Sequence, residues 1–123
     1  DALKKGKGFS PLIIETEYWG QMPHPTLMVE NTVEEVGDLL GALSHHRGEL
    51  ERNPFHLRLP AWMQDNVRRG AEVVGGQGGD APDFGFATLY RVNRWKNENL
   101  VPAWSGGKML PSSECSKQSL LKA

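Results

Sequence analysis

Two histidines and a carboxylate lie close together in one predicted helix. His45, His46 and Glu49 fall within one helical turn, and a histidine and a glutamate four residues apart can bind a transition metal from one helix face. Two ligands do not complete such a site, because catalytic zinc normally takes three from the protein. His46 also continues the apolar stripe between Leu43 and Leu50, which favours a packed or hydrogen-bonded histidine.

A second set of candidates lies at the end of a predicted strand and in the loop 20–25 that follows it. Loops at the carboxyl ends of strands form the ligand crevice of α/β folds. Aromatic and amide side chains also offer the stacking and hydrogen bonds that suit a sugar-like ligand. An ordinary ordered loop is the alternative. The predicted substrate-binding residues here are Tyr18, Trp19, Gln21 and His24.

Arg69 is a further substrate-binding candidate, on a second predicted helix. Asp65 stands four residues before it, a spacing that predicts a solvated surface ion pair. Arg69 also falls beside the Met63, Val67 and Gly70 side of the helix. From there its guanidinium could instead cross the fold and hold a carboxylate or a backbone carbonyl.

The glycine-rich stretch 75–79 resembles a phosphate-binding loop only in composition. Glycines let backbone N–H groups approach an anion closely. This stretch, however, follows a helix instead of opening one, and it lacks the Lys-Ser/Thr pair of a Walker loop. We therefore interpret residues 75–79 as a helix stop and connector.

Two strands are predicted to position the candidate residues. Residues 11–19 begin as an apolar run and continue with β-branched and aromatic residues, which is typical of a strand buried on at least one face. Residues 84–95 alternate with a period of two.

Two amphipathic helices complete the prediction. Asn31 and Glu34 can form a capping box, which predicts a helix over about residues 32–50. Pro60 suits the first residue of a second helix, which Gly75 ends. The predicted inward face of this second helix carries Leu59, Met63, Val67, Ala71 and Val74.

Two strands alone do not make a stable sheet for two amphipathic helices. We therefore predict that residues 1–104 are the C-terminal portion of a Rossmann-like, three-layer α/β fold. Its sheet would be completed by upstream residues or by another chain. Residues 105–123 are polar and lack periodicity, so they are predicted to be an extended or flexible tail.

The charge balance and the lone cysteine narrow the functional classes. Fourteen Lys and Arg residues nearly balance fifteen Asp and Glu residues, so no net positive field is available for nucleic acid or an anionic membrane. The longest aliphatic run, residues 12–14, is much too short to span a bilayer. Cys115 has no internal disulfide partner, which favours the cytoplasm.

Four segments between about residues 9 and 104 resemble the C-terminal region of PIG-L/LmbE-like N-deacetylases. The longest is HLRLPAWMQDNVRRGAEVVGGQGG, residues 56–79. APDF at 81–84 follows it, YWGQM at 18–22 resembles the family's rim loop, and ALSHHRGE at 42–49 resembles its histidine-containing helix.

This resemblance implies a zinc-dependent enzyme that hydrolyses an N-acetyl amide on an amino-sugar conjugate. The family's metal ligands and general base come from a His-Pro-Asp-Asp-Glu motif and a His-x-x-His segment, both of which would precede Asp1. Neither occurs in this chain, where Thr26 follows His24-Pro25. We therefore expect no catalytic residue and no bound zinc here, and an inactive isolated chain that completes the sheet and forms a wall of the substrate cleft.

Two alternatives remain open at this stage. One is a non-catalytic binding module that uses tryptophan anchors in a partner's groove; its candidates are Trp19, Trp62, Trp95 and Trp104. The other is a metal site assembled by folding from four histidines, His24, His45, His46 and His56.

Overall fold

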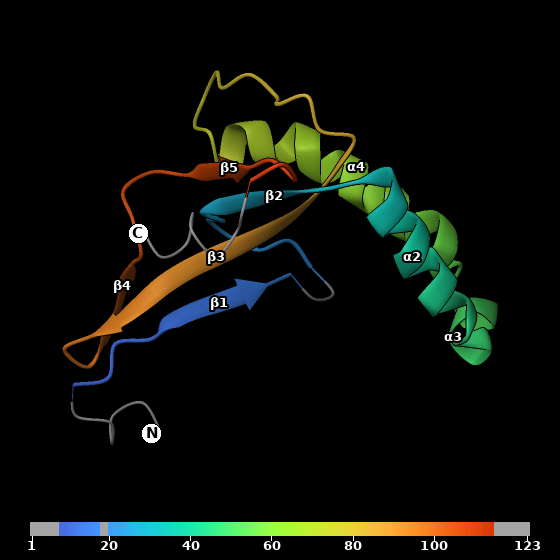
Figure 1. Cartoon of the computed structure of the whole chain (residues 1–123), viewed down its shortest axis with the longest axis horizontal. Helices are drawn as coiled ribbons and strands as arrows, with labels where there is room; N and C mark the ends of the chain where they lie inside the picture. The colour runs from blue at the N-terminus through green and yellow to red at the C-terminus, as the bar shows by residue number, and fades with distance from the viewer. Residues whose placement is uncertain (1–7, 18–19, 115–123) are drawn as a thin grey trace.

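A long strand, β3 (Phe86–Lys96), runs through the centre of a five-stranded mixed sheet (Figure 1). The computed structural model describes residues 8–17 and 20–114. In these residues the other strands are β1 (Leu12–Thr16), β2 (Leu27–Asn31), β4 (Asn99–Pro102) and β5 (Lys108–Leu110). The helices in the same residues are α2 (Val33–Ser44), α3 (Arg47–Arg52) and α4 (Phe55–Val73).

The strand order is β1-β3-β2-β5, with β4 also paired to β3. The strands β1, β2 and β4 all run antiparallel to β3, while β5 runs parallel to β2. The N-terminal half of β3 pairs with β2 and its C-terminal half with β4. One eleven-residue strand therefore brings together segments that lie far apart in the sequence.

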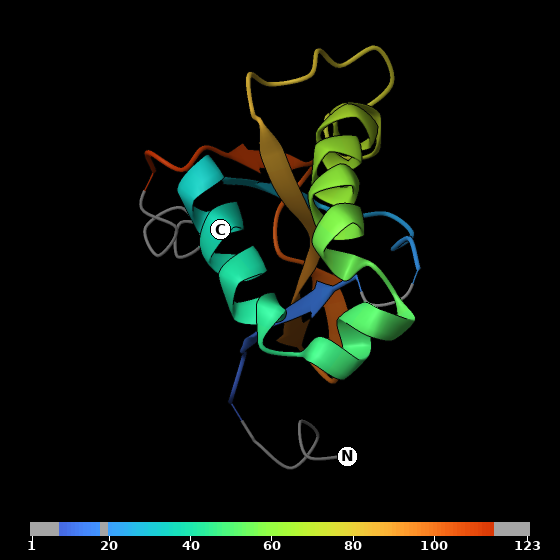
Figure 2. The same ribbon diagram turned by 90° about the vertical axis from the view of Figure 1, so that its right-hand side faces the viewer.

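Alternation along β3 builds a separate apolar cluster on each face of the sheet. Ala87 and Leu89 point to the face that α4 covers, where they pack with Met28 and Val67. On the other face Val92 packs with the remaining members of the second cluster, which are Leu27, Leu110, Leu12, Val29, Tyr90, Ala103 and Trp104. Helix α4 packs on β3, and Figure 2 shows the strands behind and between α2 and α4. The predicted period of two in this segment is confirmed.

Gly70 lets α4 lie close to the sheet. A Cβ atom added there would come within 2.7 Å of Met28 Sδ and 3.1 Å of Leu89 Cδ2, which is closer than van der Waals contact allows. Met28 and Leu89 are fully buried, so neither has free space into which it can move. The absence of a side chain at Gly70 therefore sets the distance between helix and sheet.

The predicted helix 32–50 forms as two helices, and its cap is one residue further along than predicted. Thr32, not Asn31, is the N-cap, and Glu35 closes the capping box. Asn31 instead ends β2 and accepts a hydrogen bond from Thr88. The helix then breaks between α2 and α3 at His45 and His46. Just before the break the Ser44 hydroxyl bonds back to the Gly41 carbonyl, a contact that competes with the helical ladder.

The second predicted helix begins five residues earlier than expected. Pro60 lies inside α4 rather than at its start, because Phe55 begins the helix. The predicted inward face is largely confirmed, since Met63, Val67, Ala71 and Val74 are buried, while Leu59 is half-buried. Helix α4 ends at Val73, and the following glycines Gly76 and Gly78 adopt positive φ, as predicted for a helix stop. No helix in the described part of the chain is long and apolar enough to cross a membrane.

The described residues form five strands where two were predicted. The missed strands β2, β4 and β5 have five residues or fewer. Within the predicted tail, residues 108–110 are extended but form β5 beside β2, while residues 115–123 lie outside the described residues. The structure shows a mixed α/β fold with one parallel and three antiparallel pairings.

Two glycine-to-alanine substitutions test the close contact between helix and sheet. We expect Gly70→Ala to lower the free energy of unfolding by about 1–3 kcal/mol, because it overpacks a filled core. Gly37→Ala is the matched control, since nothing lies within 4 Å of its added Cβ; it should stabilise α2 by up to about 1 kcal/mol. Urea denaturation measures both changes, and equal effects at the two positions would contradict the packing described.

Candidate functional site

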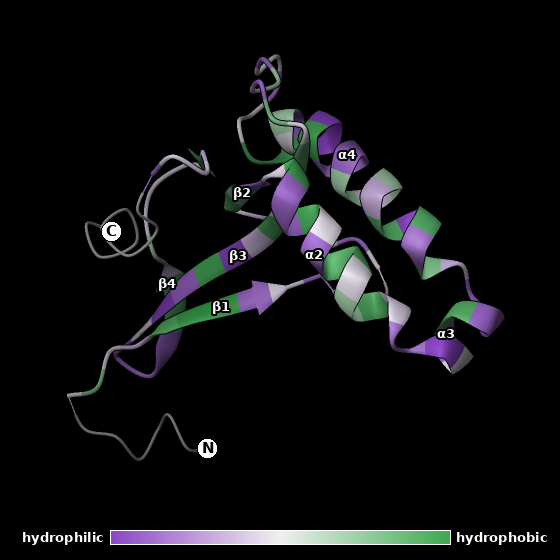
Figure 3. Ribbon diagram, turned by 45° about the vertical axis from the view of Figure 1, so that its right-hand side comes forward, coloured by the Kyte–Doolittle hydropathy of each residue, from purple (hydrophilic) through white to green (hydrophobic). Residues whose placement is uncertain are grey.

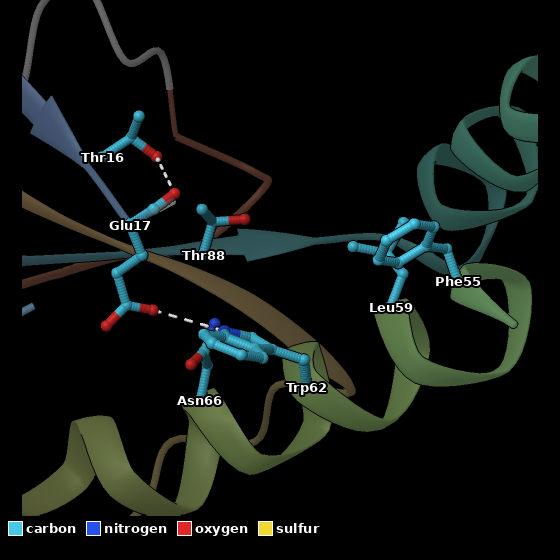
Figure 4. Close-up of a pocket in the computed structure, with 7 residues that line it drawn as sticks. All are labelled: Thr16, Glu17, Phe55, Leu59, Trp62, Asn66 and Thr88. Carbon is cyan, nitrogen blue, oxygen red and sulfur yellow. Dashed lines mark hydrogen bonds between the residues drawn. The ribbon is translucent and has the colours of Figure 1, made fainter. Parts of the chain in front are cut away.

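A hollow of about 370 Å³ opens where the C-terminal end of β1 meets α4. We call it the polar hollow to distinguish it from its neighbour, because Glu17 and Asn66 line one end of it; most of its exposed lining is apolar. In Figure 4 the Trp62 indole lies between this polar end and the apolar side chains of Phe55 and Leu59. Its described lining residues are Thr16, Glu17, Phe55, Leu59, Trp62, Asn66 and Thr88.

A neighbouring hollow of about 360 Å³ lies between α2 and α4. It shares Phe55, Leu59 and Trp62 with the polar hollow and adds Leu43 and Arg58. We call it the apolar hollow, since Arg58 is the one charged residue among its described lining residues. Trp62, whose side of α4 faces both hollows, is 43% exposed.

The Glu17 carboxylate accepts hydrogen bonds from three donors at the polar hollow, two on α4 and one in the loop before β2. Its Oε1 accepts hydrogen bonds from the Arg69 guanidinium at 2.6 Å and from the Met22 backbone N–H at 2.8 Å. Its Oε2 accepts one from the Trp62 indole N–H at 3.3 Å. The carboxylate therefore ties the end of β1, the loop before β2 and α4 to one another.

The same network continues from Arg69 to the central strand. Arg69 donates a second bond to the Asn66 side-chain oxygen at 2.9 Å, and Asn66 donates to the Ala87 carbonyl at 3.0 Å. Asn66 is 3% exposed, so its amide needs these partners to offset the loss of water. No buried side-chain polar atom in the described residues lacks a partner.

Both charges of the Glu17–Arg69 pair are largely removed from water. The side chains are 6% and 10% exposed, and removing either one would leave an uncompensated buried charge. Because both Glu17 oxygens already accept hydrogen bonds, the carboxylate is a positioning group for Trp62 and for the loop. It is not placed as a free general base.

A second ion pair crosses the sheet between β1 and β3. The Arg91 guanidinium donates to both Glu15 oxygens, at 2.7 and 3.0 Å, and Asn93 adds a third bond at 3.2 Å. The hydrogen bonds from Arg91 hold the pKa of the Glu15 carboxyl below its ordinary value, and the same pairing raises the pKa of Arg91. About a third of each side chain is exposed, so this pair is screened by solvent.

The predicted site residues take different places in the structure. Arg69 turns inward to Glu17, so the predicted surface pair with Asp65 is wrong; Asp65 pairs with Arg68 at 2.8 Å instead. Gln21 and His24 are exposed in the loop before β2 and do not line the polar hollow. Tyr18 and Trp19 lie outside the described residues.

The histidines are not assembled into a metal site. His45 and His46 are exposed at the break between α2 and α3, so the predicted packing of His46 is wrong. Among the described residues, no group of three or more His, Cys, Asp or Glu side chains could hold a metal ion. These residues therefore do not form a zinc site.

Sequence reasoning missed two polar residues of the polar hollow, Glu17 and Asn66. The sequence around each residue indicates a polar side chain at a buried position. Asn66 is a single polar residue among the inward positions Met63, Val67 and Gly70 of α4. Glu17 follows a largely aliphatic strand and is nevertheless buried. A polar group at a buried position requires a partner, and Arg69 meets that need for both residues.

Comparisons of this chain with models of known protein families, with curated proteins and with solved structures find no match.

Adjacent arginines on α4 test the buried network. We expect Arg69→Met to lower the free energy of unfolding by about 3–5 kcal/mol, because it leaves the Glu17 carboxylate buried without its cationic partner. Arg68→Met removes a charge of the same kind from an exposed pair with Asp65 and should leave the unfolding midpoint nearly unchanged. Chemical denaturation followed by circular dichroism measures both, and a similar loss at the two positions would refute the network's role.

The Glu15–Arg91 pair predicts a pH-dependent contribution to stability. The folded pKa of Glu15 is lowered, so its contribution is present above the unfolded pKa of about 4.3 and is lost as the pH falls through the folded pKa. Glu15→Gln should cost about 0.5–1 kcal/mol at pH 7, and this difference should vanish in acid. Glu51→Gln, at an exposed position on α3, is the control. A Glu15→Gln cost that grows as the pH falls would contradict the assignment.

Proposed function

We propose that this chain is the C-terminal portion of a zinc-dependent N-deacetylase of the PIG-L/LmbE-like type, with a Rossmann-like domain completed by other polypeptide. In this proposal the polar hollow is one wall of the cleft that binds an N-acetyl amino-sugar conjugate. The observation that carries the proposal is the meeting of a strand's C-terminal end with α4 at Glu17, Trp62 and Asn66. All of α4 except Phe55 lies within the longest segment that resembles the family.

The chemistry of the polar hollow suits a sugar-like group. An exposed indole face can stack on the apolar face of a sugar ring, and Trp62 is the partly exposed aromatic residue at the hollow's centre. At the other wall the hydroxyls of Thr16 and Thr88 donate to the Glu17 carbonyl and to Asn31, so they offer a sugar hydroxyl only acceptor oxygens. Ligand sites commonly combine an apolar lining with a few such placed groups.

The proposal divides the work between this chain and the rest of the protein. Zinc would polarise the amide carbonyl and lower the pKa of bound water, on ligands that lie outside this sequence. The residues of this chain hold and orient the substrate. Glu17 and Arg69 act as positioning residues, because they fix the indole edge of Trp62 and tie the loop before β2 to α4.

An interaction module is the second candidate function. Several large apolar side chains are exposed on the helices, among them Leu39 at 45%, Leu57 at 66% and Trp62 at 43%. A surface of this kind is typical of a partner interface. Sugar binding separates the two candidates, since an interaction module would not respond to an amino sugar.

Titration with a methyl glycoside of N-acetylglucosamine tests the cleft. We expect the tryptophan fluorescence of the 123-residue chain to change on binding, and Trp62→Ala to weaken the affinity by about tenfold, the equivalent of about 1.4 kcal/mol. Trp95→Phe is the matched control, because Trp95 lies on β3 and does not line the hollow. No response to the sugar would favour the interaction module.

Acetate release tests the assignment to a larger enzyme. The native polypeptide that carries this sequence should release acetate from the same sugar in the presence of zinc, with Trp62→Ala raising KM more than it lowers kcat. The 123-residue chain should release none. Deacetylation by the isolated chain would overturn the division of labour proposed here.

A further inference from the structure

Strand β1 has one edge without a strand partner in the described residues. Trp95 N–H donates to the Pro11 carbonyl at 3.0 Å, so residue 11 points its backbone groups toward β3. Backbone direction alternates along an antiparallel pair, and Ile13 and Glu15 therefore also face β3, opposite Asn93 and Arg91. It follows that Leu12, Ile14 and Thr16 direct their N–H and C=O groups to the outer edge.

The outer edge of β1 lacks the features that normally block strand addition. Proteins protect an edge with short strands, lysine, proline or bulges. At the opposite edge of the sheet, β5 has three residues, includes Lys108 and is followed by Pro111. Strand β1 has five residues with neither lysine nor proline, and Pro11 just before it turns its backbone toward β3 rather than to the outer edge. The open edge is thus β1 rather than β5.

The residue pattern of β1 is that of an interior strand. Leu12, Ile13 and Ile14 are consecutive aliphatic residues, so the strand is apolar on both faces, as is typical of strands with neighbours on both sides. In the structure, however, Ile14 is 51% exposed. A further strand along the outer edge would place side chains beside Ile14 and cover part of it.

Bare apolar surface continues from this edge onto the helices. Thr16 and Glu17, at the end of β1, line the polar hollow, and the polar hollow shares Phe55, Leu59 and Trp62 with the apolar hollow. Figure 3 shows apolar segments on α2 and on the N-terminal half of α4, where these helices project past the sheet. In α2 only Val36 is buried, and in α3 no residue is.

We infer that the outer edge of β1 pairs with a further β-strand of the same protein, lying outside this 123-residue sequence. The backbone groups of Leu12, Ile14 and Thr16 select an extended polypeptide, because only a strand satisfies alternate N–H and C=O groups along an edge. Its continuation covers the apolar hollow and so forms the wall opposite Trp62. The inference deepens the proposed function, and it rests on that proposal for placing the strand in the same protein.

Amide hydrogen exchange tests the pairing without any assay of activity. The amides of Leu12, Ile14 and Thr16 should exchange rapidly in the 123-residue chain and at least a hundredfold more slowly in the native polypeptide, captured with an antibody raised against this chain. The amides of Ile13 and Glu15, which face β3, should be protected in both and serve as internal controls. Equal exchange of Leu12, Ile14 and Thr16 in the two proteins would overturn the inference.

A proline pair provides an independent measurement. Ile14→Pro removes only an outward N–H, so the melting temperature of the 123-residue chain should stay nearly unchanged while that of the native polypeptide falls. Ile13→Pro removes a bond to β3 and should lower both melting temperatures. Concentration-dependent protection in the 123-residue chain, with dimers in sedimentation, would assign the edge to a second copy and overturn the inference as stated.

The two proposals fail separately. Slow exchange at Leu12, Ile14 and Thr16 in a native polypeptide that releases no acetate would leave the strand pairing standing and remove the deacetylase. Acetate release by a native polypeptide in which these amides exchange fast would support the deacetylase and overturn the strand pairing.

Discussion

A nearly buried ion pair between Glu17 and Arg69 joins the sheet to the helix that covers it. Charges removed from water must be matched by a partner and by hydrogen bonds, and here the matching groups come from β1, α4 and the loop before β2. Asn66 extends the contact to the backbone of β3. The candidate site lies where these constraints meet, so its geometry depends on the pair.

The rest of the fold supports this contact through the close approach of α4 and the sheet. Gly70 allows the helix to touch Met28 and Leu89, which places Arg69 and Asn66 at the level of the end of β1. Toward its N-terminus, α4 leaves the sheet and meets α2 instead. The C-terminal half of α4 therefore packs against the sheet, while its N-terminal half is exposed on the side where the two hollows lie.

This uneven packing unites the functional proposals. A substrate wall needs a fixed aromatic surface, and the hydrogen bond from Trp62 to Glu17 supplies one. A wall also needs an opposite side, and the open edge of β1 is where further polypeptide can add one. In these proposals the further polypeptide covers apolar side chains that are exposed in this structure, such as Ile14 on β1 and Leu39 on α2.

The sequence by itself determined the features that depend on near neighbours. The period of two in β3, the apolar stripe of α4 and the glycine stop after Val73 are local patterns, and the structure contains all three. Tertiary structure decided what depends on distant residues. The short strands β2, β4 and β5 form only beside partners already in place, and Arg69 finds Glu17, 52 positions away, rather than Asp65 nearby. A long side chain at the boundary of a core can reach several partners, and only packing selects the one that is shielded from water.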